Sequence, residues 1–421
     1  MSRATRILIA LIAGLAVGIG AAALAPDTAV AWSAYIKPVG TAWLNALQMT
    51  IVPLVVSLLV TGIGATAKAA RASRLATRSI LIFIALLWTS SILGALLTPI
   101  ALHWFPLAGD AAAALRDTFA AAKPVGPIPP FSEFLQAMIP TNPVEAAANS
   151  SFLPLIVFTT VFAFAVTQLP ENQRERLTGF FQALADAMLI VINWVLWIGP
   201  IGVFALAYVV GARAGTSAFG ALVHYILIVA GVGAVVSLIA YPLAFFFGRV
   251  PLGRFARAVA PSQAVAASTQ SSIASLPEML RSTEKVGLHV ASSGVVLPMA
   301  VAIFRFTGPV MNIAVAIYVA HVFGIHLGPA QLAAGVAAAA ITTMGAVGLP
   351  GQVSFISSIA PIAVAMGVPI APLALLVAVE TMPDIIRTIG NVMMDVAVTA
   401  VIVDEEGEAP ESAADALLAA D

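Results

Sequence analysis

The chain reads VAVETMPDIIRTIGNVMMD over residues 377–395, and this stretch places three acids and one arginine inside an otherwise apolar segment. On an α-helix, which turns about 100° per residue, six of its polar side chains fall on one stripe roughly 100° wide. We call these residues the polar stripe: Glu380, Asp384, Arg387, Thr388, Asn391 and Asp395. A charge at the centre of a bilayer costs at least about 2.5 kcal/mol, and charges inside spans commonly mark functional sites. The polar stripe is therefore the first candidate for a functional site.

The composition of the whole chain indicates an integral membrane protein. Of its 421 residues, 61% are hydrophobic and 9% are charged, and the mean hydropathy is +1.02. Soluble domains carry about 25% charged residues. The net charge of −1 argues against an electrostatic nucleic-acid binder. The sequence contains no cysteine, which excludes disulfides and thiolate metal sites.

Eight apolar segments are long enough to cross a bilayer, which takes about 20 helical residues. They cover residues 7–25, 38–64, 79–103, 149–168, 182–212, 219–248, 289–324 and 371–403. The first resembles a signal peptide, but its length and the apolar chain that follows favour a retained span. If all eight alternate and residues 258–280 re-enter without crossing, the basic clusters share one side, which the positive-inside rule assigns to the cytoplasm. Both termini are then cytoplasmic.

Two further segments are rich in small and hydroxyl residues and do not suit a straight spanning helix. They are TQSSIASLP at residues 269–277 and TTMGAVGLP at residues 342–350. One span lies between them, so they start from opposite faces of the membrane, as the halves of an inverted repeat do. In transporters, the unwound tips of such hairpins meet near the midplane and offer backbone groups to substrates and ions. Close helix packing explains either segment alone equally well, and the polar stripe favours a binding site.

At these motifs the chain resembles the dicarboxylate/amino acid:cation symporter family, which includes the glutamate and aspartate transporters. The matching motifs, in the family's order, are IPTNP at 139–143, PIGVFA at 200–205, the serine-rich 269–277, GLPG at 348–351 and the polar stripe. The resemblance implies an all-α integral membrane fold with eight transmembrane helices and two re-entrant helical hairpins. It also implies inverted repeats, a homotrimer and an elevator-type movement of one domain.

On this resemblance the chain divides into scaffold and transport parts. Residues 1–148 and 182–248 are expected to form mainly scaffold and trimerisation helices, with a transport-domain contribution from 79–103. Residues 149–181 are expected to form the fourth transmembrane helix and a cytoplasmic loop of the scaffold. Residues 249–403 would form the core of the transport domain, and 404–421 an acidic, disordered tail.

The resemblance also implies roles for individual residues. Arg387 matches an arginine that holds the substrate's side-chain carboxylate, a task that suits a planar guanidinium. Asp384 matches an aspartate that pairs with the ammonium group of an amino acid. The further expected substrate-binding positions are Thr388, Asn391, Ser271, Ser272, Gly348, Pro350 and Gly351.

Part of the expected site for coupling ions matches the family, and part of it departs from the family's sequence. Asn391 and Asp395 match part of a sodium site built from oxygen ligands. However, the family's Asn-Met-Asp-Gly-Thr stretch, which supplies further sodium ligands, reads FRFTG here, at residues 304–308. A guanidinium at Arg305 should repel a cation in this low-dielectric setting, although backbone carbonyls near residues 343–346 can still form a site. The residues considered for ion coupling are Glu380, Asp384, Asn391, Asp395, Thr343 and Arg305.

Three explanations for Arg305 remain open at this point. It replaces a sodium ion permanently, it binds a second substrate carboxylate, or it only neutralises the acids of the polar stripe. The first explanation leaves a proton-coupled transporter or an exchanger, in which Glu380, Asp384 or Asp395 carries the proton.

The sequence thus predicts a secondary active transporter for a small carboxylate, and no enzyme. Asp384 favours an acidic amino acid; the alternative within transport is a C4-dicarboxylate:cation symporter. An anion channel is the alternative of another class, but a stripe of mixed charge suits an occluded site better than an open pore. The expected partners are the carboxylate substrate, membrane lipid and further copies of the chain in a homotrimer in the cytoplasmic (inner) membrane. No cofactor is expected beyond a sodium ion or proton as coupling ion.

Overall fold

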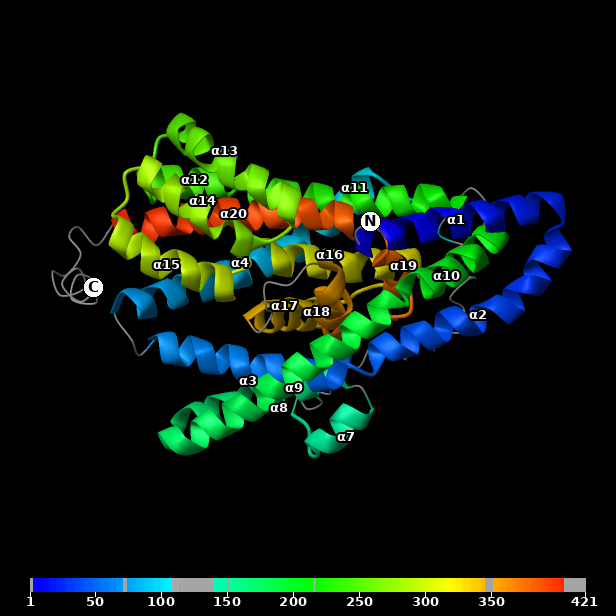
Figure 1. Cartoon of the computed structure of the whole chain (residues 1–421), viewed down its shortest axis with the longest axis horizontal. Helices are drawn as coiled ribbons and strands as arrows, with labels where there is room; N and C mark the ends of the chain where they lie inside the picture. Colours follow the sequence, from blue (N-terminus) through cyan, green and yellow to red (C-terminus); the bar gives the residue numbers. More distant parts are fainter. Residues whose placement is uncertain are drawn as a thin grey trace.

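The computed structural model describes residues 3–70, 74–107, 109, 112, 139–149, 151–214, 217–344 and 351–404, and every regular element in these ranges is a helix (Figure 1). The first half contains α1 (Arg3–Leu24), α2 (Pro26–Gln48), α3 (Ile51–Ala70), α4 (Arg74–Trp104), α7 (Pro143–Ala148), α8 (Phe152–Gln168), α9 (Glu171–Trp197) and α10 (Gly199–Ala214). The second half contains α11 (Ser217–Ser237), α12 (Ala240–Phe246), α13 (Leu252–Thr269), α14 (Ser272–Lys285), α15 (Val290–Ile303), α16 (Thr307–Val322), α17 (Pro329–Met344), α18 (Gly351–Ala365), α19 (Leu373–Leu376) and α20 (Thr381–Asp404). The predicted all-α class is confirmed for the described chain.

Within these residues, seven helical segments are long and apolar enough to cross a membrane. They are Thr5–Leu24, Pro26–Ala65, Arg74–Trp104, Glu171–Trp197, Phe219–Phe246, Ser292–Val322 and Thr381–Val403. Each overlaps one of the eight predicted spans, whereas the remaining one, 149–168, corresponds to the shorter apolar helix Pro154–Gln168. The total of eight transmembrane helices therefore stays a prediction.

Among the predicted spans that consist of more than one helix is 182–212. Residues 182–212 form no single helix, because α9 ends at Trp197 and α10 begins at Gly199. Pro200 explains this division, since proline lacks the N–H that would continue the hydrogen-bond ladder of α9. Proline is well tolerated in the first turn of a new helix.

Each of the two segments predicted to form a hairpin adjoins a pair of helices that pack against each other. In the first, α13 packs against α14, and the chain reverses at Gln270, whose φ of 52° is left-handed. A left-handed residue commonly ends a helix, and the Ser271 side chain then accepts a hydrogen bond from Ala274 N at 3.2 Å to cap α14. In the second, α17 packs against α18, and the connecting residues 345–350 lie outside the described residues. Their entry into a membrane stays a prediction.

The helix α20 lies at the centre of the C-terminal half, where it contacts α11, α13, α14, α15 and α16 (red in Figure 1). Its neighbour α16 is buried along nearly its whole length. Both helices follow a break: three residues, 304–306, separate α15 from α16, and a turn at 377–380 precedes α20. This turn divides the predicted span 371–403, and Pro383, which cannot donate a backbone hydrogen bond to residue 379, explains the division.

Candidate functional site

Arg387 is the centre of a buried ion cluster on the polar stripe. The residue is 5% exposed, and its Nη1 donates hydrogen bonds to Glu380 and, at 3.0 Å, to Asp384 Oδ1. The stripe was predicted on one helix, but Glu380 lies in the turn directly before α20. It still contacts Arg387. Tyr225 on α11 donates to the second Glu380 oxygen at 3.3 Å. Both carboxylates therefore hold one nitrogen of the guanidinium and fix its direction.

The other two nitrogens of Arg387, Nε and Nη2, are buried and have no hydrogen-bond partner among the described residues. Leaving buried donors unpaired costs about 1–3 kcal/mol each, and more for charged groups. A carboxylate can accept from two guanidinium nitrogens at once, in a strong and directional pair of bonds. The unpaired edge of Arg387 thus has the chemistry of a carboxylate-binding group.

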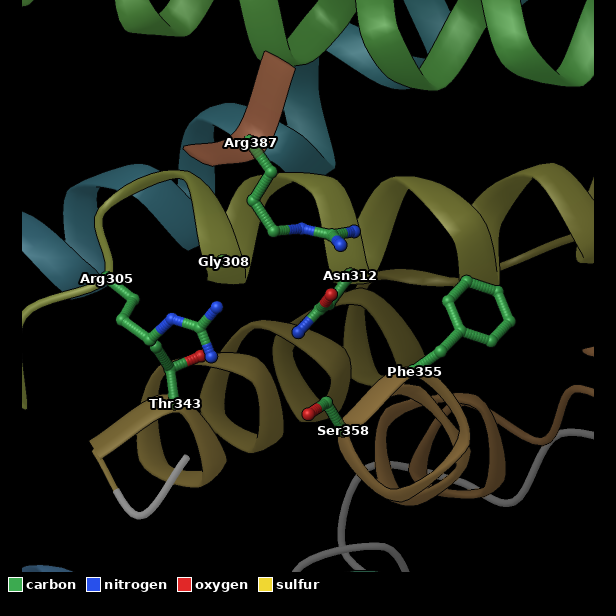
Figure 2. A pocket seen from close by; sticks show the side chains of 7 residues that line it. All are labelled: Arg305, Gly308, Asn312, Thr343, Phe355, Ser358 and Arg387. Atoms are coloured by element: carbon green, nitrogen blue, oxygen red, sulfur yellow. The ribbon is translucent and has the colours of Figure 1, made fainter. Parts of the chain in front are cut away.

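A small cavity adjoins this arginine (Figure 2). It is lined by Arg305, Gly308, Asn312, Thr343, Phe355, Ser358 and Arg387, which come from the α15–α16 break and from α16, α17, α18 and α20. Its volume is about 20 Å³, measured as the space open to the centre of a water molecule. One water needs about 10–15 Å³ on this measure. A dicarboxylate therefore fits only after neighbouring segments move apart.

Two other residues of the polar stripe have hydrogen-bonded side chains: Asn391 joins α20 to α16, and Thr388 bonds within α20. Asn391 Oδ1 accepts a hydrogen bond from the backbone N of Thr307 at 2.9 Å, and the Thr307 hydroxyl lies 2.7 Å from the same oxygen. Asn391 therefore caps the start of α16. The Thr388 hydroxyl donates to the backbone oxygen of Asp384 at 2.8 Å. Both residues are close in the sequence to Arg387, which lines the cavity, but neither of them lines it.

Asp395 is fully buried, and neither of its carboxylate oxygens has a hydrogen-bond partner in the described part of the chain. Arg305 lies close enough to Asp384, Asp395 and Arg387 to interact with their charges. The acid expected to bind sodium thus has a protein cation nearby.

The described residues at the positions expected to bind sodium fit that ion poorly. A hard cation needs several oxygen ligands, but Asn391 Oδ1 already faces two donors of Thr307. The side chains of Phe304 and Phe306 offer no oxygen, and a guanidinium lies within electrostatic range. Thr343 does line the cavity, with its hydroxyl donating to Ala339 O at 2.7 Å.

Of the five substrate-binding positions predicted in the hairpins, the structure describes three. Ser271 caps α14 and Ser272 is buried, but the cavity is not lined by either. Gly351 begins α18, whereas Gly348 and Pro350 lie outside the described residues. The sites at these five positions stay predictions.

Several cavity residues were missed by the sequence reasoning. Asn312, Phe355 and Ser358 line the cavity from α16 and α18. Asn312 carries a signal that could have been used, because it is the one side-chain amide in the apolar stretch 290–322. Phe355 and Ser358 resemble ordinary residues of an apolar helix and carry none.

Comparison with known proteins identifies relatives that span nearly the same length. Residues 4–405 match the model of the sodium:dicarboxylate symporter family. The proton/glutamate-aspartate symporter of Escherichia coli (strain K12) is 28% identical, over 85% of this chain and 82% of its own. The proton/sodium-glutamate symport protein of Bacillus subtilis (strain 168) is also 28% identical, over 96% and 92%. The C4-dicarboxylate transport protein of Anaeromyxobacter sp. (strain K) is 27% identical, over 98% and 92%.

Proposed function

Since the chain belongs to the sodium:dicarboxylate symporter family, we propose that it is a secondary active transporter of a small acidic compound, either an acidic amino acid or a four-carbon dicarboxylate. The family consists of symporters, so the chain is a transporter and no enzyme, as the sequence predicted. The proposal rests above all on the two unpaired, buried nitrogens of Arg387 beside a cavity.

Substrate binding centres on one carboxylate of the transported compound. This carboxylate accepts from Nε and Nη2 of Arg387, while Glu380 and Asp384 keep Nη1 in place. An amino acid would direct its ammonium group to Asp384 and share that carboxylate with Arg387. A dicarboxylate without an ammonium group would leave the contact between Asp384 and Arg387 intact.

The movement that exposes the cavity involves the pair α17–α18. These helices contribute Thr343, Phe355 and Ser358 to the lining, so their displacement opens the site. Our proposal includes an elevator movement of residues 249–403 against scaffold helices of a homotrimer, in the inner membrane with both termini in the cytoplasm. The seven apolar helical segments and the bacterial relatives support a multi-pass membrane protein.

Coupling to sodium is weakened in this proposal, and transport is driven by protons or by exchange of substrate. The poor oxygen ligand set around Asp395 and the nearby Arg305 support this view. Glu380, Asp384 and Asp395 are the buried acids available to carry a proton. One of the relatives is named as a proton symporter and another as a proton/sodium symport protein.

Uptake by the purified full-length chain in liposomes tests the proposal. Labelled aspartate and labelled succinate are offered under an inward sodium gradient, under an inward proton gradient, or with unlabelled substrate inside. We expect uptake of at least one compound with a proton gradient or internal substrate, and little change when choline replaces sodium. A strict sodium requirement would contradict the coupling, and substrate-independent conductance would favour the channel alternative.

A further inference from the structure

We propose that Arg305 is a second substrate-binding residue, which anchors the far carboxylate of a dianion, so that the substrate is a dicarboxylate without an ammonium group. This inference rests on the proposed transport function and concerns the same site. Arg305 and Arg387 line one cavity, although Arg305 lies in the break between α15 and α16 and Arg387 lies on α20. Figure 2 shows both guanidinium groups directed toward the space around Gly308 and Asn312.

The backbone around Arg305 turns its side chain toward the cavity. Phe304 has extended backbone angles, φ −111° and ψ 91°, in which neighbouring side chains point to opposite sides. Its ring stacks on Phe83 of α4 with 4.7 Å between centroids, and lies 6.0 Å from the ring of Phe306. The two phenylalanines are fully buried, whereas Arg305 between them is half-buried and lines the cavity. The backbone of this helix break therefore places the two phenylalanines in the core and the arginine at the cavity.

The cavity presents positive charge and hydrogen-bond donors to a ligand. Two guanidinium groups, one amide and two hydroxyls line it, and no carboxylate does so among the described residues. Asp384 and Asp395 attract the Arg305 guanidinium and Arg387 repels it, and such charge interactions are strong in a low-dielectric interior. A dianion with a carboxylate at each end relieves this repulsion by binding between them.

The three acids of the polar stripe do not reach the surface of the cavity. Glu380 and Asp395 are fully buried and Asp384 is 2% exposed, and none of the three lines the cavity. Neither hairpin tip, at residues 269–277 and 342–350, contains an acid. An ammonium group would thus face two guanidinium groups. Because three acids accompany two arginines, we expect the dianion to enter together with protons, in agreement with the proposed coupling.

Three ligands of similar length separate the alternatives on the purified full-length chain: succinate, a dianion; butyrate, a monoanion; and aspartate, which carries an ammonium group. Calorimetry or thermal shift should show succinate binding at least about tenfold more tightly than either, a difference of about 1.4 kcal/mol. In Arg305→Met, the preference for succinate over butyrate should fall to about threefold or less. Arg305→Lys should keep part of it, since a charge remains.

The matched control is Arg281→Met, because Arg281 on α14 has a side chain that is 70% exposed and contacts Glu278 at the surface. It should bind all three ligands as the unchanged protein does. Equal or tighter binding of aspartate, or an unchanged succinate preference in Arg305→Met, would overturn the inference and leave the transport function standing. If Arg305→Met does not fold, the ligand series and Arg305→Lys still decide. A folded protein that binds none of the three ligands and takes up none contradicts the proposed function as well.

Discussion

The helix pairs α1–α10 and α16–α20 lie in different parts of the molecule and pack in opposite ways (Figure 1). Between α1 and α10 the backbones touch: a methyl group added to Gly14 would lie 2.6 Å from Phe204 O, and one added to Gly211 would lie 2.7 Å from Leu15 O. Between α16 and α20 the contact is polar, with Asn391 bound to Thr307. The first pair depends on small residues and shape, and the second on buried groups that each need a partner.

This difference indicates where function and stability reside. A close apolar contact has no unpaired group, so changing it should affect folding and assembly and not ligand choice. The polar region beside α20 also contains the unpaired nitrogens of Arg387, and changing Arg387 should alter binding before it alters folding. The predictions below test this division, beginning with the largest expected effect.

Arg387→Lys should reduce transport by more than about hundredfold. Lysine keeps the charge that faces Glu380 and Asp384 but lacks the paired Nε and Nη2 donors, and charged hydrogen bonds contribute about 1.5–3 kcal/mol each. Initial uptake rates in liposomes measure the loss, with Arg281→Lys as the exposed control. Uptake within threefold of the unchanged protein would show that the unpaired edge of Arg387 is not the carboxylate anchor.

Gly14→Ala should lower the unfolding free energy by about 1–3 kcal/mol, the usual cost of overpacking. The added methyl group meets the backbone oxygen of Phe204 and the Ala207 side chain, so α1 and α10 must move apart. Gly20→Ala on the same helix is the control, because nothing lies within 4 Å of its new Cβ. Thermal unfolding in detergent measures both. A Tm for Gly14→Ala that equals that of Gly20→Ala would show that the close contact is not stabilising.

The sequence predicted the polar stripe because a charged residue in an apolar segment is a local and unusual signal. Arg387, Asp384 and Glu380 do form one cluster, as their shared helical face suggested. The break before Thr381 was not foreseen, although Pro383 in the sequence is consistent with it. A proline marks a helix boundary only when the surrounding packing allows the chain to turn there.

The hydrogen-bond partner of Asn391 was harder to predict than the burial of its side chain. Its partner Thr307 is 84 residues away in the sequence, and no local pattern indicates which helix start will lie beside it. The same holds for Phe355 and Ser358, which reach the cavity only through the packing of α18. Sequence periodicity shows which face of a helix carries the polar residues. It does not show which neighbouring helix packs against that face.

Asn391→Leu should lower the unfolding free energy by about 1–3 kcal/mol, because the backbone N–H of Thr307 then loses its acceptor while it stays buried. Asn391→Asp keeps an acceptor oxygen at the same place and should lose less at neutral pH. The comparison of the two Tm values, with and without sodium, is the measurement. If sodium raises the Tm of the unchanged protein and not that of Asn391→Leu, then Asn391 belongs to an ion site after all.

The smallest effect is expected at Trp43 on α2, whose indole nitrogen donates to the backbone oxygen of Val195 on α9 at 2.9 Å. Trp43→Phe removes this donor and leaves a ring in place, so the net loss should be about 1 kcal/mol. Trp32→Phe on the same helix is the control, because Trp32 is 57% exposed and should lose almost nothing. Ligand affinity should be unchanged in both variants, since no residue of α2 lines the cavity. A change in succinate or aspartate affinity in Trp43→Phe alone would show that the close-packed helices also influence the site, and the division between the two regions would no longer hold.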